Sequence, residues 1–140
     1  MDWIGPMTVD ALLDQVAVSW ENAPPESNGV YVVSVRHWKN EPDTECEPLY
    51  IGGNTGRSAR FRTRLGDLIA DMFGFYGQST GHHSGAQSLN SYCREQKINP
   101  KHLFIGWGTD CACGRCGEVE LFDRLRPKLN KKRPSRCREH

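Results

Sequence analysis

The sequence lacks long apolar runs, a signal-peptide pattern at its N-terminus and a strong net charge of either sign. Its longest apolar runs are far shorter than the about 20 residues that a membrane-spanning helix needs, so we expect no membrane partner. Without a signal-peptide pattern, the expected location is the cytoplasm. A net charge of +1 favours neither a polyanion nor a polycation as the partner.

The sequence also lacks internal repeats and any linker long enough to divide it. Its 140 residues, of which 37% are hydrophobic and 25% are charged, are typical of a soluble globular protein. This length predicts a single domain that spans residues 1–140.

Basic residues are unevenly distributed and gather near the C-terminus. Residues 124–138 contain no acid, and a cluster of this kind can contact phosphates. The alternative is a solvated, frayed tail with no ligand. The basic side chains of this stretch are Arg124, Arg126, Lys128, Lys131, Lys132, Arg133, Arg136 and Arg138.

The hydrophobic pattern predicts an α+β fold in which helices flank a small three-stranded antiparallel sheet. Thr8 is a candidate N-cap for the first helix, and Pro127 ends the last one because its ring cannot continue the helical hydrogen bonds. Strands are expected at residues 29–35, 49–52 and 102–109, and helices at 8–19, 57–73, 86–96 and 118–125.

Two tyrosines, each two residues from a glycine on a predicted strand, form the most informative pattern. They lie in Gly29-Val30-Tyr31 and in Tyr50-Ile51-Gly52. An arginine on a predicted helix, a glutamate on the last helix and an asparagine near the C-terminus follow in order. These three residues are Arg60, Glu118 and Asn130.

In this combination the chain resembles the GIY-YIG nuclease family over residues 28–131, most of its length. The resemblance implies a Mg²⁺- or Mn²⁺-dependent endonuclease that hydrolyses DNA phosphodiester bonds, with Glu118 as the metal ligand and Arg60 as the family's helical arginine. It implies a catalytic core at 28–131, an N-terminal helical extension at 1–27 and a basic tail at 132–140.

The residue types suit this chemistry. Glu118 supplies a hard oxygen for a single Mg²⁺, which takes its other ligands from water and phosphate. The guanidinium of Arg60 matches the geometry of a phosphate. Tyr31 is the predicted general base, provided that nearby cations or a bound water lower its pKa. Tyr50 is expected to hold the water or a phosphate oxygen.

Contacts with DNA, double-stranded or branched, are expected around this site. The glycines after Tyr50 remove side chains where a nucleic-acid backbone must come close. The residues predicted to contact DNA are Gly52, Gly53, Arg57, Arg62, Arg64, Asn130, Lys131 and Lys132. Because no separate recognition domain is visible, a homodimer or a protein partner could supply further specificity.

The chain departs from the family pattern in three places. Residues 37–47 look like an insertion, as in restriction-type members. Arg64 stands where many members carry a histidine or tyrosine, and its alternative role is a surface ion pair with Asp67. The adjacent His82 and His83 are candidates for the missing imidazole, with a loop of no catalytic role as the alternative.

The stretch CACGRC is a second candidate metal site. Cys111, Cys113 and Cys116 could bind a structural Zn²⁺, with Cys137, Cys93 or His140 as the fourth ligand. Unligated thiols, an iron–sulfur cluster and a disulfide are the alternatives. The competing function is therefore a non-catalytic, zinc-containing module that binds nucleic acid.

Overall fold

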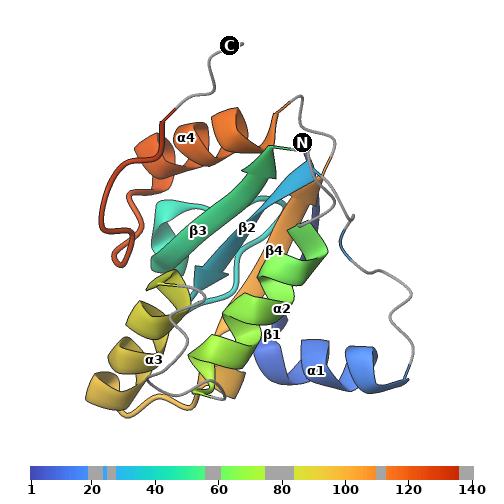
Figure 1. Ribbon diagram of the computed structural model, residues 1–140, viewed down its shortest axis with the longest axis vertical. Helices are drawn as coiled ribbons and strands as arrows, with labels where there is room; N and C mark the ends of the chain where they lie inside the picture. Colours follow the sequence, from blue (N-terminus) through green and yellow to red (C-terminus); the bar gives the residue numbers. More distant parts are fainter. Residues whose placement is uncertain (19–23, 25–27, 56–60, 75–83, 110–112, 136–140) are drawn as a thin grey trace.

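The structure is a computed structural model, shown in Figure 1, that describes residues 1–18, 24, 28–55, 61–74, 84–109 and 113–135. Of the predicted site residues, Arg57, Arg60, His82, His83, Cys111 and Cys137 lie outside the described residues.

Four antiparallel strands form one sheet in the order β1-β4-β2-β3. The strands are β1 (Asp2–Thr8), β2 (Asn28–Ser34), β3 (Pro48–Thr55) and β4 (Phe104–Thr109), and the helices are α1 (Val9–Val18), α2 (Phe61–Met72), α3 (Ser84–Gln96) and α4 (Gly114–Leu125). Two short 3₁₀ turns, η1 (Thr44–Cys46) and η2 (Pro100–His102), complete the described elements.

The expectation of a three-stranded sheet is wrong, because the residues before the first helix form a fourth strand. β1 pairs only with β4, so it is an edge strand of the sheet. An edge strand tolerates a proline such as Pro6, whose missing N–H deprives no neighbouring strand of a hydrogen bond. The pairing is interrupted between Ile4 and Met7, where the register shifts. The N-terminal segment is thus part of the sheet and not only a helical extension.

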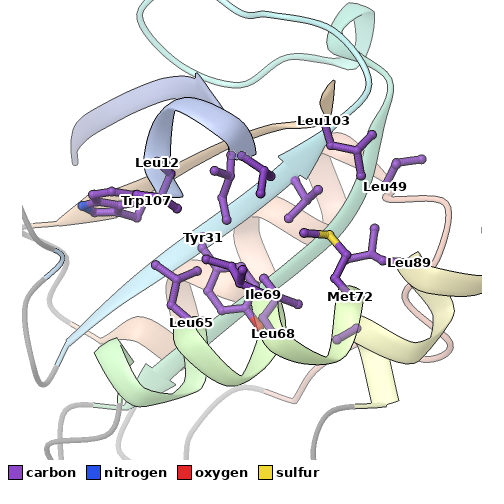
Figure 2. Packing of buried hydrophobic residues seen from close by; sticks show 14 of the residues in the cluster. Leu12, Tyr31, Leu49, Leu65, Leu68, Ile69, Met72, Leu89, Leu103 and Trp107 are labelled. Atoms are coloured by element: carbon purple, nitrogen blue, oxygen red, sulfur yellow. The ribbon is translucent and has the colours of Figure 1, made fainter. Parts of the chain in front are cut away.

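The helices cover the two faces of the sheet unequally. Tyr31 and Val33 of β2 point to the face on which α1, α2 and α3 pack. Figure 2 shows the Tyr31 ring extending from β2 toward Leu65, Leu68 and Ile69 of α2. The intervening residues of β2 point to the opposite face, where they pack with Leu121 and Leu125 of α4.

Local sequence signals explain where α1 and α2 form. The Ala11 N–H donates to the Thr8 hydroxyl at 3.1 Å, so the predicted cap is confirmed. The apolar stripe of α2 is buried on one side, as its helical spacing predicts. This stripe consists of Phe61, Leu65, Leu68, Ile69 and Met72.

The last helix begins earlier than the sequence predicts. α4 starts at Gly114, in the stretch expected to be a loop. Gly114 and Gly117 are both buried in the first turn, and Gly114 lies close enough to β3 that a Cβ at Gly53 would be 3.1 Å from its carbonyl oxygen. Close helix–sheet packing therefore outweighs the low helix propensity of glycine.

The residues predicted as an insertion are packed against the sheet. Trp38 is buried, and its ring meets Trp3 of β1 edge to face at a centroid distance of 6.3 Å. Cys46 is also buried, in the same cluster as Trp38. The segment 37–47 is thus anchored at both ends.

The free edge of β3 is covered by the chain that follows α4. Arg126 ends α4 with a φ of +50°. The Lys128 N–H then donates to the Pro48 carbonyl at 3.1 Å, and the Leu129 N–H donates to the Leu49 carbonyl at 2.7 Å. This segment, residues 126–132, is called the C-terminal strap below. Among the described residues, no helix is both long and apolar enough to cross a membrane.

Candidate active site

The two motif tyrosines lie side by side on neighbouring strands. In the β2–β3 register, Tyr31 is opposite Gly52 and Val33 is opposite Tyr50, so both rings leave the same face of the sheet. Their ring centroids are 6.2 Å apart, and a side-chain hydrogen bond joins them. The strands thus bring together two phenol groups that are nineteen residues apart in the chain.

Glycines make room for both rings. A Cβ on Gly52 would overlap the ring and hydroxyl of Tyr31, and a Cβ on Gly85 of α3 would overlap the ring of Tyr50. Gly53 instead allows the backbone of α4 to approach, since its Cβ would be 3.1 Å from the Gly114 oxygen. The expectation that Gly52 and Gly53 leave an open space for nucleic acid is therefore corrected: the protein's own groups occupy that space.

The tyrosines differ in exposure. Tyr31 is 1% exposed, and its ring contacts Phe61 at a centroid distance of 6.1 Å. Tyr50 is only half-buried and borders a cavity of about 160 Å³. Of the two, Tyr50 is the one that a substrate can reach directly.

Burial raises the pKa of Tyr31 well above its usual value, and the charges of Tyr50 and Glu118 raise it further, against a lowering by Arg64. The condition that nearby cations lower the pKa of Tyr31 is therefore not met, because desolvation outweighs the effect of Arg64. Burial also raises the pKa of Tyr50, and so does Glu118, while Arg64 and the hydrogen bond with Tyr31 lower it.

Glu118 completes this group from the other side of the sheet. It is half-buried on α4, and burial raises its pKa from 4.5 to about 6, with opposing effects from Arg64 and Arg115. Glu120, two residues along, is exposed and lines a separate cavity with Trp3. Two residues turn a helix by about 200°, which predicts that Glu120 points away from Glu118. The different surroundings of the two side chains agree with this prediction.

Arg64, on a described part of α2, is a cation of the site. It is exposed on α2, and its charge acts on both tyrosines and on Glu118. Among the described residues, no ion pair joins it to Asp67, the alternative partner. Arg64 was predicted only as a DNA contact, and its charge also lowers the pKa of both tyrosines.

Two further predicted DNA contacts have partners within the chain. The Arg62 Nε donates to the Pro24 carbonyl at 3.0 Å. The Asn130 side chain pairs with the backbone of Ile51 in both directions: it accepts from the N–H at 3.0 Å and donates to the carbonyl at 3.1 Å. Asn130 therefore extends the coverage of β3, and its contact with DNA stays a prediction. Lys131 and Lys132 follow it, are exposed and line the cavity at Tyr50.

Only part of the candidate zinc site lies in the described chain. Cys113 is the N-cap residue of α4 and is buried, and Cys116 lies in the first turn of the helix. Within the described ranges, no group of three or more His, Cys, Asp or Glu side chains could hold a metal ion. Zinc binding stays a prediction that elemental analysis of the purified protein can test.

Sequence reasoning missed Gly85 and Arg115. Gly85 matters only because α3 crosses Tyr50, a long-range contact with no local signal. Arg115 lies in a stretch that was expected to be a loop. Because α4 begins at Gly114, Arg115 is on the same helix as Glu118, whose pKa it lowers.

No family model, curated protein or solved structure matches the chain.

Proposed function

We propose that the protein is an endonuclease that hydrolyses DNA phosphodiester bonds with the help of one divalent metal ion, Mg²⁺ or Mn²⁺. One observation carries the proposal: Tyr31 and Tyr50 lie side by side with ring centroids 6.2 Å apart, and the charges of Arg64 and Glu118, from two further elements, affect the pKa of both. Phosphodiester hydrolysis needs groups that move a proton, a cation for the phosphate and a ligand for a metal. Two phenols, a guanidinium and a carboxylate can supply these three functions in that order.

Glu118 suits a magnesium site that keeps most of its water. It is the carboxylate of the group, and hard oxygen ligands are those that Mg²⁺ prefers. With one protein carboxylate, the remaining ligands would be water and substrate oxygens, the usual situation for Mg²⁺ at phosphates. When bound, the ion supplies positive charge to the phosphoryl oxygens and lowers the pKa of water.

Arg64 provides a second, permanent positive charge. Because it is exposed, its guanidinium is accessible to a phosphate, which it can bind through two parallel hydrogen bonds. It also favours the ionised forms of the tyrosines and of Glu118. Arg60, four residues earlier in the sequence, lies outside the described residues and keeps its proposed role from the family resemblance.

The tyrosines have different roles in the proton transfer. Tyr50 borders the cavity, so we assign it the contact with the attacking water or the phosphate oxygen. Tyr31 is buried beside it, and their shared hydrogen bond lowers the pKa of Tyr50. Tyr50 is therefore the proposed base, and Tyr31 supports it through this hydrogen bond without touching the substrate.

Plasmid nicking in Mg²⁺ and in EDTA tests the proposal, with Glu118→Gln as the decisive variant and Glu120→Gln as its matched control. Glu118→Gln should lower cleavage by several orders of magnitude, while DNA affinity stays equal or rises because a negative charge is lost. Glu120→Gln should cleave as the wild type does, since Glu120 faces another cavity.

Tyr31→Phe and Tyr50→Phe should each lower cleavage by about 10²- to 10⁴-fold, the usual contribution of one acid–base group. Both keep the ring and hence the packing. If the wild type binds DNA but does not nick it with either metal, the protein is the non-catalytic binding module instead. If Glu118→Gln retains full activity, the proposed metal ligand is wrong.

A further inference from the structure

Two adjacent cavities lie along α3, and one of them borders Tyr50. The smaller, of about 160 Å³, is lined by Tyr50, Ser88 and Lys131 among others. The larger, of about 470 Å³, is also lined by Ser88 and Lys131 and extends to Tyr92 and Gln96. Because they share lining residues, the two cavities are neighbours, and together they are called the α3 groove.

The two walls of the α3 groove differ in chemistry. One wall is the polar side of α3, with hydroxyl and amide groups such as those of Gln87, Ser88 and Ser91. The other wall is the C-terminal strap, which contributes lysines. Among the described residues that line the groove, Glu95 is the one acidic side chain. The lysines of the strap are Lys128, Lys131 and Lys132.

The lysine wall is held in place. Backbone hydrogen bonds fix Lys128 and Leu129 to β3, and the Asn130 amide fixes the next residue. The Lys128 ammonium lies 5.2 Å from the centre of the Tyr92 ring, within the range of a cation–π contact. The cations therefore sit on an ordered backbone beside α3, which lowers the entropy lost when a polyanion binds.

We propose that the α3 groove holds one unpaired strand of DNA that continues from the phosphate at Tyr50. The preferred substrate would then be DNA with a single-stranded arm next to the cleavage site. This inference rests on the proposed function, because that function identifies Tyr50 as the place where the phosphate lies.

A single strand fits the groove better than a duplex does. The groove lies between α3 and the strap, and its larger cavity of about 470 Å³ has room for a sugar–phosphate backbone. Basic grooves with an aromatic side chain are typical of single-strand binding sites. A paired duplex would present its phosphates to the lysines but leave the polar wall of α3 without contacts.

The test compares two DNAs with the same duplex, one blunt and one with a single-stranded arm of about six nucleotides, within the usual site size. Binding is measured by fluorescence anisotropy in EDTA, so that no cleavage occurs. The wild type should bind the armed DNA at least about tenfold more tightly. The triple variant Lys128→Gln, Lys131→Gln, Lys132→Gln should lose this preference, because its affinity for the armed DNA should fall much more than its affinity for the blunt duplex.

The salt dependence gives a second measure. Loss of three lysine–phosphate contacts should reduce the slope of log affinity against log salt for the armed DNA by about 2, because each contact on a single strand contributes about 0.7. Lys101→Gln is the control, since Lys101 is exposed near Asp10, away from the groove. It should leave both the slope and the preference unchanged.

Ser91→Glu probes the other wall without removing a lysine. Ser91 is exposed on α3, so the substitution should not affect folding, and its negative charge should weaken binding of the armed DNA alone. A wild type with no preference for the armed DNA overturns the inference, and so do variants that weaken both DNAs equally. If the protein nicks DNA but has no preference for the arm, the proposed function is supported and the inference about the α3 groove is wrong. If it prefers the arm but does not nick DNA in Mg²⁺, the groove inference is supported and the proposed function is wrong.

Discussion

Replacement of Gly52 by alanine should destabilise the protein and separate the two tyrosines. The added Cβ would overlap the hydroxyl and the ring of Tyr31. Because Tyr31 is 1% exposed and surrounded by α2 side chains, its ring cannot swing into solvent to relieve the overlap. Either the ring shifts within the packed core or β3 moves away from β2.

The magnitude follows from this packing. Insertion of a methyl group into a filled core costs about 1–3 kcal/mol. For a chain of 140 residues, 1 kcal/mol corresponds to a change in Tm of about 3 °C. Gly52→Ala should therefore lower the Tm by about 3–9 °C. Nicking should also fall, since the hydrogen bond between the tyrosines depends on the position of the Tyr31 ring.

A matched control and a double-mutant cycle isolate the cause. Gly66, exposed on α2, would have no atom within 4 Å of an added Cβ, so Gly66→Ala should stabilise the helix by about 0.5–1 kcal/mol. Tyr31→Leu removes the overlapping ring atoms, so Gly52→Ala should cost little in that background. The coupling free energy between the two sites should be about 1–3 kcal/mol. Additive effects would show that the ring contact is not what requires glycine at position 52.

Three other predictions concern stability. Asn130→Ala removes both hydrogen bonds to the Ile51 backbone and should lower the free energy of unfolding by about 1–3 kcal/mol in urea titrations. Asp71 is 5% exposed and its Oδ2 has no hydrogen-bond partner among the described residues, so Asp71→Asn should raise the free energy of unfolding by about 1 kcal/mol. The half-buried Asp67→Asn should change it by less than about 0.5 kcal/mol. The raised pKa of Glu118 means that the folded state holds this proton more tightly, so the contribution of Glu118 to stability is fully present below pH 4.5 and is lost as the pH rises through about 6. In EDTA the wild type should lose about 2 kcal/mol over this window relative to Glu118→Gln, as thermal melts at pH 4.5 and 7.5 would show.

The sequence predicts the parts of the site that depend on local periodicity. The β-branched run before Ser34 and the apolar segment around Ile51 indicate two strands, and the structure pairs them as antiparallel neighbours. Helical periodicity separates Glu118 from Glu120, and the two occupy different surroundings. These features follow from the two-residue repeat of a strand and the 3.6-residue repeat of a helix.

The features that could not be predicted depend on contacts between distant segments. β1 contains Pro6 and a register shift, so it has no regular alternation, and its pairing with β4 decides its structure. The start of α4 depends on the packing of Gly114 against β3. The burial of Tyr31, and with it the raised pKa, results from the way in which α2 crosses the sheet.

The location of the site on the edge strand explains how its parts can meet. Tyr31 and Tyr50 lie on the face covered by α1, α2 and α3, whereas α4, which carries Glu118, packs on the opposite face. Groups on opposite faces of a sheet can share a ligand only around its edge or its end. β3 is an edge strand with two successive glycines, and the described hydrogen bonds from the C-terminal strap reach no further along it than Ile51. The strap thus protects the part of β3 that carries Tyr50 against pairing with other chains, whereas no described hydrogen bond from the strap reaches Gly52 or Gly53.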